Sequence, residues 1–138
     1  MATSNNQGRA YEYAYLIAFE KRVKPYRDVV IVKNSAFEAA QGAWDDVGED
    51  MRQNHAASAV AGVKKLLEAE PLILDGSDTL EVKIQTDEAG KSGDVRDILV
   101  VRNGANWEIG LSVKHKLVFQ TRNDKLAGYR TGSFIKCY

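Results

Sequence analysis

The 138-residue sequence contains a single cysteine, only two prolines and two histidines, and no excess of charge of either sign. A lone cysteine, Cys137, excludes an internal disulfide and any cysteine-based zinc site. No apolar run approaches the roughly 20 residues that span a membrane, and the N-terminus lacks the basic flank and apolar segment of a secretory signal. We therefore expect a cytoplasmic protein without a membrane partner.

The composition is otherwise that of an ordinary globular domain, with 44% hydrophobic and 28% charged residues. The length suits one domain with a modest core, and there is no internal repeat or low-complexity segment, so we expect a single domain over 1–138. The glycine pair Gly90 and Gly93 lacks the spacing of a phosphate-binding loop. No nucleotide cofactor is therefore expected.

Charge is distributed unevenly along the chain. Residues 112–138 hold six of the 19 Lys and Arg residues but only one of the 19 acids, so this end carries +5 and the rest −5. A basic end beside an acidic body fits a polyanion partner, and it equally fits a solvated tail.

Three helical patterns occupy the first half. Residues 8–22 are apolar almost all round, which predicts a buried helix. A capping-box pattern, Ser35 to Glu38, opens a second helix whose apolar stripe reaches Met51. A third helix is expected over about 54–70, ended by Pro71, with His55 on its surface and an apolar side formed by Ala56, Ala59, Val60, Val63, Leu66 and Leu67. The short run 29–32 is a candidate edge strand.

In the second half of the chain, the spacing of hydrophobic residues changes from the helical repeat to strict alternation. Residues 80–85 predict a half-buried strand, and two further strands are expected from about 95–102 and 107–115, around the turn signal Asn103-Gly104. Helices followed by an antiparallel meander indicate an α+β fold.

The turn fixes the register of this hairpin. If Gly104 and Ala105 form the loop, Asp97 lies opposite Ser112, and Lys114 is its diagonal neighbour on the same face. The other face should belong to the core and consists of Ile98, Val100, Trp107, Ile109, Leu111 and Val113.

An acid and a lysine on one face suit phosphodiester hydrolysis. A carboxylate can hold Mg²⁺, and a neighbouring lysine can orient or deprotonate the attacking water. The simpler interpretation is an exposed cross-strand ion pair, worth less than about 1 kcal/mol. His115 follows Lys114 in the sequence. By the alternation of the strand, its side chain should point to the apolar face and pack there.

Several segments resemble one protein family. They are 7–12, 34–44, 67–72, 84–87, 93–102 and 107–115. In order, over roughly 7–116, they are similar to the HaeIII-type restriction endonucleases. The resemblance implies the PD-(D/E)XK nuclease fold and Mg²⁺-dependent cleavage of double-stranded DNA at the palindrome GGCC.

The resemblance also implies roles for individual residues. Asp97 corresponds to the metal-binding acid and Lys114 to the motif lysine, while Ser112 stands where a second acid is usual. Glu12, on the first helix, could supply that acid as a catalytic and metal-binding residue. Lys91 and Lys116 are candidates for contact with DNA phosphates. A palindromic target predicts a homodimer.

After residue 116 the chain no longer resembles the family, whose members are much longer. We therefore expect a truncated or frame-shifted reading frame, a core that is incomplete, and a divergent basic tail over 117–138. Two other hypotheses stay open: an inactive remnant that at most binds DNA weakly, and a nuclease of the same fold, such as a repair enzyme, without preference for GGCC.

Overall fold

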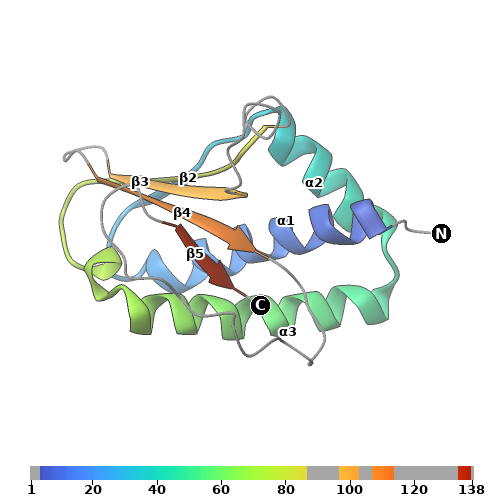
Figure 1. Cartoon of the computed structure of the whole chain (residues 1–138), viewed down its shortest axis with the longest axis horizontal. Helices are drawn as coiled ribbons and strands as arrows, with labels where there is room; N and C mark the ends of the chain where they lie inside the picture. Colours follow the sequence, from blue (N-terminus) through green and yellow to red (C-terminus); the bar gives the residue numbers. More distant parts are fainter. Residues whose placement is uncertain (1–3, 87–96, 103–106, 114–133, 138) are drawn as a thin grey trace.

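The computed structural model places three helices beside a five-stranded mixed sheet (Figure 1). It describes residues 4–86, 97–102, 107–113 and 134–137. The elements are α1 (Ser4–Val23), β1 (Val29–Ile31), α2 (Ser35–Asp46), α3 (Glu49–Ala69), the short helix η1 (Pro71–Leu74), β2 (Leu80–Ile84), β3 (Ile98–Arg102), β4 (Trp107–Val113) and β5 (Phe134–Cys137). The α+β class predicted from the sequence is confirmed.

Helix α1 packs against the other two helices on one side and against the sheet on the other (Figure 1). Tyr11, Tyr15, Leu16 and Phe19 are all at most 1% exposed. A helix that is apolar all round is one that is covered all round. The pattern over 8–22 therefore predicted this central helix correctly.

The boundary between helices α2 and α3 differs from the predicted one. Val47 has an extended backbone and Gly48 is the N-cap of α3, so α3 begins at Glu49 rather than near 54. Met51, predicted on the second helix, lies on α3. Arg52 donates to the carbonyl oxygens of Trp44 (3.0 Å) and Asp45 (2.8 Å), which closes the last turn of α2.

The start of α2 is correct but its cap is not Ser35. The Asn34 side chain accepts a hydrogen bond from the Phe37 amide (2.9 Å), so Asn34 is the N-cap and Ser35 the first helical residue. The Asn34 amide group also donates to the Ile84 carbonyl (3.1 Å). This one side chain thus joins α2 to the end of β2.

The predicted surface position of His55 is wrong. His55 is 1% exposed and its ring lies 5.5 Å from that of Tyr11 on α1. The buried stripe of α3 passes through His55, Ala59, Gly62 and Val63, while Val60 is 61% exposed. The stripe is therefore rotated toward α1, whose Tyr11 ring packs against the histidine.

The sheet has the order β1-β2-β3-β4-β5. Strands β2, β3 and β4 form the predicted antiparallel meander, and β1 and β5 flank it in parallel pairings. Within the tail expected over 117–138, Phe134–Cys137 thus pairs with β4. The short helix considered near 124–129 falls outside the described residues.

No helix in the described part of the chain is long and apolar enough to cross a membrane.

Candidate functional site

The hairpin of β3 and β4 has the predicted register. Ile98 pairs with Leu111 and Arg102 with Trp107, so Asp97 falls opposite Ser112. Four predicted core residues of β3 and β4 besides Leu111, namely Ile98, Val100, Ile109 and Val113, are at most 3% exposed. The side chain of Trp107 and the turn at 103–106 lie outside what the structure describes.

Asp97 is held by the strands on both sides of β3. Its backbone amide donates to the Leu111 carbonyl (2.7 Å), and its carbonyl accepts from the Gln85 amide (2.8 Å). The residue therefore stands where β2 ends, β3 begins and β4 is about to end. Its position follows from the two strand registers and not from a flexible loop.

The Asp97 carboxylate is also oriented. Its Oδ2 accepts a hydrogen bond from the Val113 amide (2.9 Å), and the Ser112 hydroxyl lies 3.5 Å from the same oxygen. A backbone donor fixes the side-chain direction without a second flexible side chain. The carboxylate is thus preorganised beside the strand that leads into Lys114.

The face that carries Asp97 is more enclosed than an exposed ion pair requires. Leu99 and Ser112 on this face are 5% and 8% exposed. Asp97 itself is partly buried beside them.

Glu12 lies half-buried on α1, the helix that also packs against β4. Lys91, Lys114, His115 and Lys116 fall outside the described residues. The structure therefore brings together Asp97 and Ser112 from the predicted site, and places Glu12 on the helix beside the same sheet.

The donor set can be compared with the needs of Mg²⁺. Among the described residues, no group of three His, Cys, Asp or Glu side chains is arranged to hold a metal ion. Mg²⁺ commonly keeps several waters and uses only one or two carboxylates together with substrate phosphates. Asp97, with the Ser112 hydroxyl beside it, is compatible with such a site.

A second polar centre lies at the other end of β3, and the sequence analysis missed it. We call Arg27, Asp78 and Arg102 the arginine cluster. Arg27 follows α1, and its buried guanidinium binds the Ile73 carbonyl (3.1 Å) and the Asp78 carboxylate. Arg102 ends β3 and binds the same carboxylate at 3.0 Å.

The hydrogen bond with Asp78 raises the pKa of Arg102 above its ordinary value. Gly76 adopts a positive φ of 142°, and a Cβ there would lie 3.0 Å from the Arg27 guanidinium. The signal available in the sequence was an arginine, Arg102, at the end of a predicted strand.

Comparisons with known proteins identify the family of the chain. The family model for the HaeIII restriction endonuclease matches residues 8–126. The type II restriction enzyme HaeIII of Haemophilus aegyptius is 39% identical over 112 residues, which are 81% of this chain and 35% of that enzyme. The chain thus spans about a third of the length of this curated relative. No solved structure matches it.

The matched segment contains α1 from residue 8 onward, the whole β2–β4 meander and every predicted site residue. The chain belongs to the HaeIII restriction endonuclease family.

Proposed function

We propose that this chain carries the catalytic strands of a type II restriction endonuclease, which hydrolyses phosphodiester bonds of double-stranded DNA with Mg²⁺. The observation that supports it most is the oriented carboxylate of Asp97 between β2 and β4, in a chain that belongs to this family. The PD-(D/E)XK site places an acid at this junction and a lysine on the next strand.

Each residue has a defined task in this proposal. Asp97 holds Mg²⁺, assisted by Glu12 from α1, and Lys114 orients or deprotonates the water that attacks phosphorus. The bound cation supplies charge neutralisation at the phosphate. Lys91 and Lys116 contact phosphates of the backbone, which sets the position of the duplex and not its sequence.

The proposed substrate is double-stranded DNA that contains a short palindrome. The resemblance to the family suggests that this palindrome is GGCC. A two-fold target is matched by a two-fold protein, in which each subunit cuts one strand. In this proposal the enzyme needs no nucleotide cofactor and acts in the cytoplasm.

The second candidate function is DNA binding without cleavage. The observation that favours it is Ser112, because a hydroxyl occupies the position of the second acid beside Asp97. A one-carboxylate site that is not completed by Glu12 would bind Mg²⁺ weakly. Weak duplex binding through Lys91 and Lys116 would then be the remaining activity.

The experiment uses the purified chain, Mg²⁺ and two duplexes that differ only in a GGCC site. We expect cutting of the GGCC duplex alone. We expect Lys114→Ala to slow it by about 10²–10⁴-fold, the usual loss when a proton-transfer group is removed. Lys65→Ala, an exposed lysine on α3, is the matched control and should cut normally.

The outcomes separate the hypotheses. Absence of cutting by a folded chain that still shifts the duplex in a gel supports DNA binding alone. Cutting of both duplexes at equal rates indicates a nuclease of the same fold without restriction specificity. Calorimetric titration with Mg²⁺ should detect binding to the original chain and a clear loss with Asp97→Asn.

A further inference from the structure

Asp97 has a polar neighbour on each side of β3. On the β4 side this neighbour is Ser112. On the β2 side it is Gln85, whose backbone amide donates to the Asp97 carbonyl (2.8 Å). This hydrogen bond continues the register in which Ile84 pairs with Ile98. Gln85 therefore lies directly across from Asp97, one residue beyond the end of β2.

Gln85, Asp97 and Ser112 share one face of the sheet. Along β2 the core-facing residues are buried, whereas Gln85 and the other alternate positions are half-buried. Ser112 lies between the core residues Leu111 and Val113, so its side chain also points away from the core. The Ser112 hydroxyl lies 3.5 Å from Oδ2 of Asp97 on that side. The three side chains thus form a line across β2, β3 and β4, which we call the polar row.

The polar row is bordered on this face by residues of a different kind. The next positions share a lack of side-chain oxygen and are Lys83, Leu99 and Gly110. Among the described residues, the direct cross-strand neighbours that offer Asp97 a side-chain oxygen are therefore Gln85 and Ser112. Directly opposite residues have Cβ atoms roughly 4.5–5.5 Å apart, so two such side chains reach a common ion.

The side-chain oxygens of the row suit Mg²⁺. This ion prefers hard oxygen ligands, which include both carboxylates and carbonyl groups. Ser112, at the position of the usual second acid, offers only a short hydroxyl. On the other side of Asp97, Gln85 offers an amide oxygen on a side chain as long as that of glutamate.

We propose that Gln85 is a metal-binding residue of this site, and that its Oε1 atom shares Mg²⁺ with the Asp97 carboxylate. The inference rests on the proposed function for the presence of Mg²⁺ and adds a neutral ligand to it. An amide in place of a second carboxylate removes one negative charge from the site. The free ion is then bound less tightly, since affinity for divalent cations depends on the charge of the ligands. The ion keeps more of its charge for the DNA phosphate.

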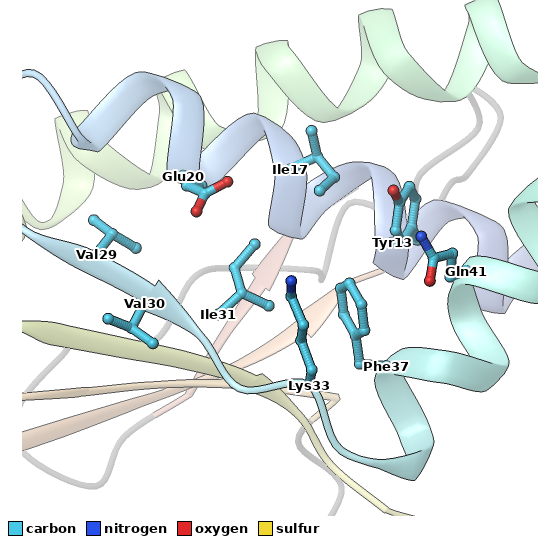
Figure 2. Close-up of a pocket in the computed structure, with 9 residues that line it drawn as sticks. All are labelled: Tyr13, Ile17, Glu20, Val29, Val30, Ile31, Lys33, Phe37 and Gln41. Carbon is cyan, nitrogen blue, oxygen red and sulfur yellow. The ribbon is translucent and has the colours of Figure 1, made fainter.

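A second glutamine with different surroundings provides the matched control. A cavity of about 440 Å³ opens between α1, β1 and the start of α2, and the exposed Gln41 of α2 lines it (Figure 2). Figure 2 shows Gln41 beside Tyr13, whereas Glu20, the acid among the lining residues, lies at the other end of the cavity. No residue of the polar row lines this cavity. Substitution of Gln41 therefore changes a glutamine outside the candidate site.

The test is calorimetric titration of the full chain with Mg²⁺ in the absence of DNA. We expect Gln85→Ala to raise the dissociation constant by about tenfold, the lower end of the loss when a group around a metal is removed. Gln85→Glu keeps the side-chain length and replaces the amide by a carboxylate, so it should lower the dissociation constant by about tenfold. Gln41→Ala and Gln41→Glu should leave it unchanged.

The opposite signs of the two Gln85 variants separate metal binding from other roles. A residue that only supports the fold would weaken binding in both variants. A residue that only donates to a DNA phosphate would change Mg²⁺ binding in neither. Either result overturns the inference. Gln85→Glu has the shape of the original side chain, so it carries the test if circular dichroism shows that Gln85→Ala does not fold.

Asp97→Asn keeps this test distinct from that of the proposed function. If Asp97→Asn loses Mg²⁺ while both Gln85 variants bind it like the original chain, Gln85 is not a ligand and the proposed site remains. If Asp97→Asn binds Mg²⁺ like the original chain, the ion lies elsewhere and the proposed function loses its metal site. Absence of binding by both the original chain and Gln85→Glu overturns both proposals.

Discussion

At the scale of single residues, Gly62 sets how closely α3 approaches α1. A Cβ at this position would lie 2.9 Å from Cε2 of Tyr15, and the Tyr15 hydroxyl donates to the Gly62 carbonyl (3.3 Å). We expect Gly62→Ala to lower the free energy of unfolding by about 1–3 kcal/mol, because overpacking outweighs the better helix propensity. Urea denaturation measures this change.

The matched control is another helical glycine with the opposite surroundings. Gly42 lies on α2, and a Cβ there would meet nothing within 4 Å. Gly42→Ala should therefore stabilise the protein by about 0.5–1 kcal/mol, the normal gain in a helix interior. If both substitutions stabilise, the close contact between Tyr15 and Gly62 does not exist in solution.

Single residues are also where sequence reasoning reached its limit. The opposition of Asp97 and Ser112 followed from a local turn and strict alternation, both readable in the sequence. The burial of His55 did not, because it depends on α1, more than 30 positions earlier in the chain. The arginine cluster was missed for the same reason, since it joins three segments that are distant in sequence.

At the scale of elements, Asn34 decides where α2 begins and how it is attached to the sheet. Its side chain caps the helix and also donates to the Ile84 carbonyl. Asn34→Ala should cost about 1–2 kcal/mol of stability, the range for removal of a helix cap.

Ser35→Ala distinguishes this cap from the capping box that the sequence suggested. Ser35 is exposed and lies one residue inside the helix, so its substitution should change stability by less than about 0.5 kcal/mol. An equal loss for both variants in the same urea titration would show that Ser35 shares the capping role.

Elements were predicted best where their contacts are local. The meander β2–β3–β4 joins neighbours in sequence; its strands followed from periodicity, and the register of β3 against β4 followed from the turn residues. The end of α2 was placed too late because the apolar stripe continued across Val47 into Met51, whereas Gly48 stops the helix. The parallel partners β1 and β5 bring together distant segments, for which a single sequence holds no register information.

At the scale of the whole molecule, the candidate site and the arginine cluster lie at opposite ends of β3. Asp97 directly precedes β3 at one end, and Arg102 ends it at the other, within the arginine cluster. The cluster links the segment after α1, the turn before β2 and the end of β3. We infer that it holds the helical layer and the sheet together at a distance from the candidate site.

Asp78→Asn tests this role. Arg27 has a fully buried side chain, and the loss of its acid leaves a buried guanidinium without a counter-charge. Because Asp78 itself is 18% exposed, we expect a loss of about 2–4 kcal/mol, somewhat less than for a fully buried pair. The pKa of Arg102 is raised above an ordinary value that is already strongly alkaline, so this arginine stays charged near neutral pH. The loss of stability should therefore be the same at every pH around neutrality.

Asp75→Asn provides the comparison within the same turn. Asp75 is exposed and contributes its backbone carbonyl to Arg27 (3.1 Å), which the substitution preserves. It should therefore cost less than about 0.5 kcal/mol. Both variants should keep the affinity for Mg²⁺ of the original chain wherever they are folded, since Asp97 lies at the opposite end of β3. Equal stabilities for Asp78→Asn and Asp75→Asn would mean that the cluster does not hold the two layers together.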